Sequence, residues 1–156
     1  MGRLNPTALA FICTALLING CSAIKLYKSE LPQNLEVISR VESVEATLDI
    51  YRVGNQCETE YLGAVALDSD ILKLGIATGQ ASYLVIGFAS SSFWGNSSSY
   101  TSYDITLLPR KAHRYEIAVS YIDEIYNVDL NEINQNTGEK RELTDKELQN
   151  CRQFNS

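Results

Sequence analysis

From Ala46 onward, apolar and polar residues mostly alternate along the chain, a period of two that is typical of β-strands with one buried face. The pattern is clearest in Arg114–Ile122, whose odd-numbered positions hold only tyrosine, isoleucine and valine. Seven such runs follow one another at short spacing: Ala46–Val53, Tyr61–Leu67, Ile71–Ile76, Ala81–Ala89, Tyr103–Leu108, Arg114–Ile122 and Tyr126–Ile133. Short strands with little helix predict an all-β fold, an antiparallel β-sandwich of about seven strands.

Turn and cap residues mark the ends of these runs. Asp123-Glu124 separates the last two runs and predicts a hairpin between them. Thr144 and Glu147 have the spacing of a capping box, so one short C-terminal helix is expected over Asp145–Arg152. Val37–Glu45 suits a helix as well as a strand, and its pattern does not decide between them.

A short apolar stretch lies near the N-terminus. Ala8–Ile18 is apolar apart from Thr14 and falls short of the about 20 residues that a bilayer-spanning helix requires, so it fits the core of a signal peptide. It ends in Leu16–Cys21, which resembles a bacterial lipobox: an aliphatic residue, a spacer, a small residue, and a cysteine that receives lipid. An uncleaved anchor or a buried helix is the alternative interpretation.

The lipobox implies three segments. Cleavage would remove residues 1–20 as a signal peptide and leave a diacylated, palmitate-bearing Cys21 that anchors the protein in the bacterial cell envelope. Residues 21–34 mix small, charged and turn residues and are expected to form a flexible tether. Residues 35–156 would form the periplasmic β-sandwich domain. Ser22 follows the cysteine in place of aspartate, which in lipoproteins of this kind implies export to the outer membrane.

The charge of the chain narrows the choice of partners. It has 13 basic and 19 acidic residues, a net charge of -6, and loss of Arg3 with the signal peptide leaves 12 against 19, a net charge of -7. An acidic chain without a basic run is poorly suited to nucleic acids and to anionic lipid headgroups. Membrane attachment is therefore expected to come from the lipid on Cys21.

Cysteine usage fits an oxidising compartment. Cys13 lies in the signal peptide and Cys21 in the lipobox, which leaves the pair Cys57 and Cys151. A single remaining pair predicts a disulfide, which would close a loop of about 95 residues and contribute about 4–5 kcal/mol on the chain-entropy model. A metal site or a reactive thiol is the alternative, although the chain has one histidine and no Cys-x-x-Cys motif.

Three groups of short motifs lie in the predicted strands. They are Ala46–Arg52, which ends in Tyr-Arg; Val65–Asp68 and Leu74-Gly75 with Gly79 and Tyr83; and Ile105–Leu108, Tyr115–Ile117 and Val128–Leu130. Together they resemble a family of small bacterial lipoproteins of unknown function, over Ala46–Leu143. The resemblance implies a compact β-sandwich and no catalytic residues. The chain departs from the family pattern at Asp68–Asp70 and at Pro109–Ala112, where glycine is usual.

The sequence predicts no catalytic residue, no metal site and no cofactor. His113, the single histidine, stands in the basic segment Arg110–Arg114, without a neighbouring carboxylate to orient it for nucleophilic catalysis, and a solvated turn is expected there. Asp68 and Asp70 could contribute to a calcium site, but the further oxygen ligands and the glycine spacing of a calcium loop are missing. A polar turn is favoured for them.

One segment is a candidate for contact with a partner. Ser90–Ser102 is long, small and polar, and carries Phe93, Trp94 and Tyr100, a composition typical of binding loops with aromatic anchors. A flexible hairpin loop whose aromatic residues fold back onto the sheet is the alternative.

These features predict a lipid-anchored envelope lipoprotein that acts without catalysis, by binding a protein or a cell-wall component through Phe93, Trp94 and Tyr100. The first alternative is an inhibitor or immunity protein, or a structural lipoprotein, whose acidic charge would suit a basic target. An envelope hydrolase is the weakest of the hypotheses, because neither a nucleophile motif nor a metal cluster is present in the sequence.

Overall fold

The computed structural model describes residues 24–91, 98–123 and 125–144, and within these the fold is all-β, with no helix. The strands are β1 (Leu35–Val41), β2 (Glu45–Val53), β3 (Thr59–Ala66), β4 (Ile71–Leu74), β5 (Ser82–Ser91), β6 (Ser98–Leu107), β7 (His113–Ile122), β8 (Ile125–Asn134) and β9 (Lys140–Glu142). Each of the seven runs predicted from periodicity overlaps one strand of this set, and four of them extend one or two residues beyond it. The expected helix over Asp145–Arg152 lies outside the described residues.

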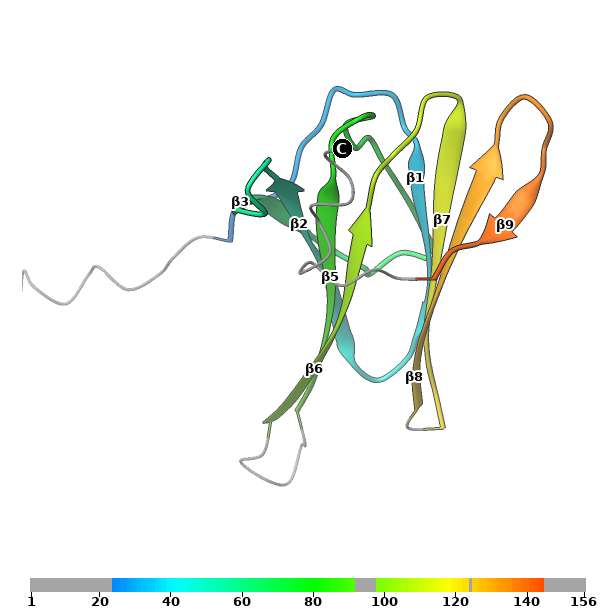
Figure 1. The fold of residues 1–156 in the computed structure, drawn as a ribbon. Helices are drawn as coiled ribbons and strands as arrows, with labels where there is room; N and C mark the ends of the chain where they lie inside the picture. Colours follow the sequence, from blue (N-terminus) through cyan, green and yellow to red (C-terminus); the bar gives the residue numbers. More distant parts are fainter. Residues whose placement is uncertain (1–23, 92–97, 124, 145–156) are drawn as a thin grey trace, which may run out of the picture.

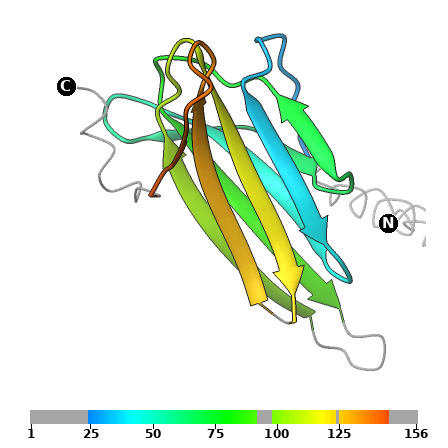
Figure 2. The ribbon, with the colours of Figure 1, turned by 90° about the vertical axis from the view of Figure 1, so that its right-hand side faces the viewer.

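The strands form two sheets that face each other in a sandwich-like arrangement (Figures 1 and 2). One sheet has the order β4-β1-β7-β8-β9 and the other the order β3-β2-β5-β6. Every pair of neighbours is antiparallel except β1 and β7, which are parallel. The expectation of a wholly antiparallel sandwich is therefore wrong at this one pair, because the chain crosses between the sheets several times before β7 pairs with β1.

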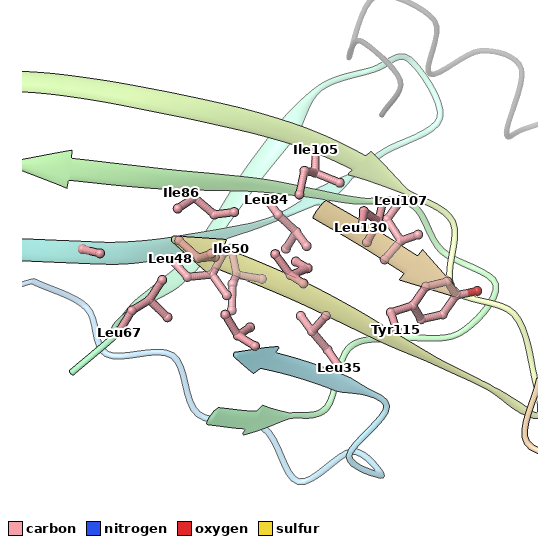
Figure 3. Packing of buried hydrophobic residues seen from close by; sticks show 14 of the residues in the cluster. Leu35, Leu48, Ile50, Leu67, Leu84, Ile86, Ile105, Leu107, Tyr115 and Leu130 are labelled. Carbon is pink, nitrogen blue, oxygen red and sulfur yellow. The ribbon is translucent and has the colours of Figure 1, made fainter. Parts of the chain in front are cut away.

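The core lies between the two sheets and is built from the apolar positions of the alternating runs. In β7, Tyr115, Ile117 and Val119 are almost completely buried, as the period of two predicts. Figure 3 shows side chains from both sheets meeting in this cluster. Burial of each of these large apolar side chains stabilises the fold by about 1.5–3 kcal/mol. The buried members of this core cluster are Leu35, Val37, Ala46, Leu48, Ile50, Leu67, Ile76, Leu84, Ile86, Phe88, Ile105, Leu107, Tyr115, Ile117, Val119 and Leu130.

The segment that suited a helix or a strand is divided between two strands. Leu35, Val37 and Ser39 of β1 are buried, with more exposed residues between them, and Glu45 begins β2. The strand conformation prevails because β1 pairs with β7 on one edge and with β4 on the other, so its backbone groups enter the ladder.

The N-terminal segment differs from the expected flexible tether, because residues 24–34 lie along the domain. Tyr27 N donates to Ala64 O at 2.9 Å, Ala64 N donates to Lys25 O at 2.8 Å, and the Tyr27 hydroxyl donates to Gly75 O at 2.6 Å. Asn34 is buried, and its side chain exchanges two hydrogen bonds of 2.8 and 2.9 Å with the backbone of Ile76. The free edge of β3 therefore gains a partner from the same chain.

Gly63 permits this close approach. It has a φ of 145°, and a Cβ on it would lie 2.6 Å from the backbone nitrogen of Tyr27. Only glycine combines that backbone conformation with the absence of a side chain. The composition of residues 24–34 predicts a linker, but edge hydrogen bonds and one buried amide fix the segment on the domain.

Candidate functional site

Four tyrosines from four neighbouring strands form the most distinctive surface of the described residues. They are Tyr51 on β2, Tyr61 on β3, Tyr83 on β5 and Tyr100 on β6, and we call them the tyrosine face. Tyr51 is the register partner of both Tyr61 and Tyr83.

The tyrosine face lies on the outer side of the four-stranded sheet. Ile50 and Leu84, the sequence neighbours of Tyr51 and Tyr83, are fully buried in the core. Because successive side chains of a strand point to opposite sides, the tyrosines point away from the core. The same alternation that builds the core thus places the tyrosines on the outer side of the sheet.

The ring of Tyr51 packs against the rings of Tyr61 and Tyr83. The ring centroids of Tyr51 and Tyr61 are 5.1 Å apart and those of Tyr51 and Tyr83 are 5.6 Å apart, with interplanar angles of 50° and 51°. Tilted pairs at this separation contribute about 0.5–1.5 kcal/mol each beyond the area that they bury. The three side chains are half-buried, so they form a semi-rigid aromatic surface that solvent still reaches.

Two carboxylates orient the hydroxyls of this surface. The Tyr61 hydroxyl donates to Asp49 Oδ1 at 3.1 Å, and the Tyr83 hydroxyl donates to Asp104 Oδ2 at 2.9 Å. Burial, together with the hydrogen bond to Asp104, raises the pKa of Tyr83 to about 12. Burial also raises the pKa of Tyr51 and of Tyr61, with Asp49 as a further cause for both. These phenols therefore stay neutral at physiological pH, while the carboxylates add acceptors to an aromatic surface.

Tyr100 is the most exposed member, at 64%. Its ring lies over Gly87 of β5, where a Cβ would come within 2.6 Å of the Tyr100 hydroxyl oxygen. Gly87 thus leaves the space in which the ring packs against the sheet. Tyr100 was expected from the sequence as an aromatic anchor, and the structure places it on the same side of the sheet as three tyrosines that sequence reasoning did not connect with it.

The expected loop over Ser90–Ser102 is shorter than predicted. Ser90 and Ser91 end β5 and Ser98–Ser102 begin β6, and the hydroxyls of Ser90 and Ser99 lie 2.6 Å apart across the hairpin. Small polar residues suggested a loop, but continued backbone pairing with the neighbouring strand outweighs that weak local preference. Phe93 and Trp94, the other expected anchors, lie outside the described residues.

A second polar group lies at one end of the core, and we call it the Glu132 cluster. Glu132 is 5% exposed. It accepts hydrogen bonds from the Tyr115 hydroxyl at 2.9 Å, from Arg110 Nε at 2.8 Å and from an Arg141 terminal nitrogen at 2.7 Å. The Tyr115 hydroxyl in turn accepts from the Arg110 backbone N–H at 2.9 Å. In Figure 3 the Tyr115 hydroxyl points away from the apolar side chains of the core.

The chemistry of the Glu132 cluster suits it to stabilising the fold. Burial by itself would raise the pKa of Glu132, but hydrogen bonds from Arg110, Tyr115 and Arg141 outweigh it and lower the pKa to about 2. Such a carboxylate stays ionised near neutral pH and has no proton to give as a general acid. Its hydrogen bonds and charges are used within the protein.

Sequence reasoning missed the Glu132 cluster, although a signal was present. In the run Tyr126–Ile133 the core-facing positions are Tyr126, Val128 and Leu130, and Glu132 is the next position in that series. A carboxylate at a core-facing position indicates a buried charge, which requires partners. Its two arginines come from other segments, and only the tertiary structure brings them to it.

His113 differs in its surroundings from the expected solvated turn. It is half-buried at the start of β7, and its Nδ1 donates to the backbone oxygen of Lys111 at 2.8 Å, because a carbonyl can only accept. It lines a hollow of about 220 Å³ with Arg110, Glu132 and Glu139, among others. The hydrogen bond of its Nδ1 is therefore made within the turn that precedes β7.

The backbone oxygen of Asp70 accepts from Ser39 N at 2.9 Å, so this residue extends the pairing of β4 with β1. Within residues 24–91, 98–123 and 125–144, there is no cluster of three or more histidine, cysteine and acidic residues that could hold a metal ion.

Several predicted features lie partly or wholly outside the described residues. Cys57, in the turn before β3, is a disulfide cysteine, but its predicted partner Cys151 is outside, so the pairing stays a prediction. Residues 1–20, the predicted signal peptide, and Cys21, the predicted site of lipid attachment, are outside as well. The described part of the chain has no helix long and apolar enough to cross a bilayer.

No family model matches the chain, and no curated protein is detectably similar to it in sequence. Its resemblance to small bacterial lipoproteins therefore remains a prediction from its motifs.

Proposed function

We propose that the protein is a lipid-anchored lipoprotein of the bacterial envelope that acts without catalysis, by binding an envelope protein or a cell-wall component through its tyrosine face. The observation that carries the proposal is the grouping of Tyr51, Tyr61, Tyr83 and Tyr100 on one side of one sheet. Large aromatic side chains that are half-buried and supported by neighbours are typical anchors of binding surfaces.

The arrangement favours binding over simple solvation. Tyrosine presents a large apolar ring with few rotatable bonds, so little conformational entropy is lost when a partner covers it. Tyr83 and Tyr61 are held further by hydrogen bonds to carboxylates. Asp104 and Asp49 keep free lone pairs, which suit a partner with hydroxyl or ammonium donors, such as a sugar chain or a lysine-bearing protein.

The proposed lipid anchor would hold this domain close to the membrane. Lys25 is already fixed to β3 through the 2.8 Å hydrogen bond from Ala64 N. Between it and Cys21 lie residues 22–24, and the fully extended chain between the two Cα atoms spans at most about 14 Å. The anchored domain would therefore act at the bilayer surface, with little freedom to reach a distant partner.

Two matched variants on one strand test the surface. Tyr100 and Tyr103 are both on β6, three residues apart, so their side chains point to opposite sides of the sheet. The full chain would be captured from bacterial envelopes, and bound proteins and cell-wall fragments would be quantified. Tyr100→Ala, alone and with Tyr51→Ala, is expected to reduce capture of a specific partner by about tenfold or more, whereas Tyr103→Ala should leave it within about twofold. Equal capture by all variants would contradict the proposal.

The anchor is tested separately by mass spectrometry. Processing of the full chain in a bacterial host is expected to remove residues 1–20 and to add a diacylglyceryl group to Cys21, and Cys21→Ser should abolish both changes. An intact N-terminus on the membrane-associated protein would refute the anchor and leave the binding surface to be judged by its own experiment.

The second candidate function is inhibition of a target protein, and the acidic charge of the chain favours it. The chain carries a net charge of -6, and Asp49 and Asp104 lie within the tyrosine face. A basic cell-wall hydrolase would complement such a surface, and its inhibition should weaken steeply with added salt. The absence of any effect on basic wall hydrolases at low salt would remove this candidate.

A further inference from the structure

Strand β1 is only partly covered by β4, the short edge strand beside it. β4 has four residues and pairs with Leu35–Ile38, whereas β1 continues to Val41 and stays paired with β7 throughout. In Figure 2, β1 runs on past the start of β4. The final part of β1 therefore has one paired edge and one edge that no described strand covers.

The backbone of this part of β1 has groups available for a further strand. Ser39 N donates to Asp70 O at 2.9 Å, so the odd-numbered residues of β1 direct their backbone groups toward the β4 side. Asn34, just before β1, does not follow this alternation, because its N–H donates to Leu74 O of β4 while its carbonyl accepts from Tyr115 N of β7. The backbone N–H and C=O of Val41 accordingly point to the side where β4 is missing.

A groove of about 850 Å³ lies along this edge, lined by Ile38–Ser43, Asp70-Ile71 and Tyr121–Asp123. Ile71 is 55% exposed and lies beside Ile38 on the β4 side of β1. Ile122 is 59% exposed and follows Tyr121, the β7 partner of Val41 near the end of β1. The groove thus combines unused main-chain groups with two apolar contact points.

The charged side chains of the groove are mostly acidic. Glu42, Asp70 and Asp123 are exposed and line it, against a single basic residue, Arg40. Asp123 and Asp70 are the sequence neighbours of Ile122 and Ile71. A ligand that pairs with the β1 backbone would gain from positive charge beside its apolar residues.

We propose that the β1 edge groove binds an extended, basic segment of a partner protein, which adds antiparallel to β1 as a continuation of β4. Main-chain hydrogen bonds to Val41 would supply the pairing, the two isoleucines would contact apolar side chains, and the carboxylates would select lysine or arginine. This site is on the other sheet from the tyrosine face and is independent of the function proposed for that face.

A peptide of alternating lysine and valine, seven residues long and labelled with fluorescein, is the probe. Fluorescence anisotropy with the full chain in detergent is expected to show saturable binding. The same peptide with glutamate in place of lysine, or with proline at its centre, should bind about fivefold more weakly or worse, because charge or a main-chain donor is lost. Hydrogen exchange should slow at residues 39–43 when the lysine peptide is present.

Two double variants of equal charge change locate the site. Asp70→Lys with Asp123→Lys is expected to weaken binding at least about fivefold. Asp129→Lys with Glu142→Lys changes two exposed carboxylates on β8 and β9 of the same sheet and should change binding less than about twofold. The proposal is overturned if the lysine peptide does not saturate, if the glutamate peptide binds as well, if both double variants behave alike, or if slowed exchange maps elsewhere.

Discussion

The molecule uses the pairing of a tyrosine hydroxyl with a carboxylate in two different ways. In the Glu132 cluster, the Tyr115 hydroxyl oxygen lies 2.9 Å from Glu132 Oε1, and both residues are buried. Two arginines donate further hydrogen bonds to this carboxylate. On the tyrosine face, the Tyr83 hydroxyl oxygen also lies 2.9 Å from a carboxylate oxygen, Oδ2 of Asp104, but Asp104 is exposed. The bond is the same, and its surroundings differ.

This difference decides what each pair contributes. A buried carboxylate must be compensated by partners, and their loss destabilises the fold. An exposed carboxylate is solvated whether or not the tyrosine is present, so its bond adds little stability and mainly orients a ring. We therefore expect variants of the Glu132 cluster to change folding and variants of the tyrosine face to change binding.

The largest effect is expected for Glu132→Gln. The change removes the charge that holds Arg110 and Arg141, and we expect the free energy of unfolding to fall by about 2–3 kcal/mol, a value moderated by the solvent exposure of both arginines. Denaturant unfolding measures it. The matched change Asp104→Asn should cost less than about 0.5 kcal/mol, and an equal cost at both sites would remove the contrast between them.

Unfolding at low pH should show how much the ionised Glu132 carboxylate contributes to stability. The pKa of Glu132 falls from 4.5 to about 2 on folding, so its contribution is fully present above pH 4.5 and is lost as the pH falls toward 2. The unfolding free energy of the native chain should thereby fall by up to about 3 kcal/mol more than that of Glu132→Gln over this range. Denaturant midpoints at a series of pH values test this, and parallel curves for the two proteins would contradict it.

Removal of the two hydroxyls compares the pairs directly. Tyr115→Phe leaves the Arg110 backbone N–H without its acceptor and takes a donor from Glu132, at an expected cost of about 1–2 kcal/mol. Tyr83→Phe should cost less than about 0.5 kcal/mol, because Asp104 is exposed to water. Thermal and denaturant unfolding of both variants give the comparison, which would fail if the order of the costs were reversed.

Alkaline titration should detect the orienting bond on the tyrosine face. Asp104→Asn removes the carboxylate that helps to raise the pKa of Tyr83 to about 12, while burial, the larger cause, remains. The pKa of Tyr83 should therefore fall but stay above 10.0. Absorbance of tyrosinate, with Tyr83→Phe to assign the transition, is the measurement. An unchanged titration would mean that Asp104 does not act on Tyr83.

The smallest effect on stability is expected for Gly87→Ala. Its methyl group would meet the end of the Tyr100 side chain, which can rotate away, so the unfolding free energy should change by no more than about 0.5 kcal/mol. The displaced ring should weaken capture of the partner nonetheless. Gly79→Ala, where no atom lies within 4 Å but φ is 76°, is the counterpart that strains backbone instead of moving a tyrosine.

Much of the fold could be predicted because alternation is a local property. The runs around Leu48, Leu84 and Ile117 mark both the strand and its buried side, and all three residues are fully buried. The candidate site was harder to predict from the sequence. Tyr100 was expected as an anchor on composition, but Tyr51, Tyr61 and Tyr83 are separated along the chain, and their adjacency depends on strand register.

The sequence by itself determined that this chain forms strands and which side of each strand is apolar, because a period of two acts between near neighbours. Only the tertiary structure decided which strands lie side by side: it grouped the tyrosines, surrounded Glu132 with Arg110 and Arg141, and docked Tyr27 against Gly75. These contacts join distant segments, and their energies depend on burial and on hydrogen-bond partners that no local pattern specifies.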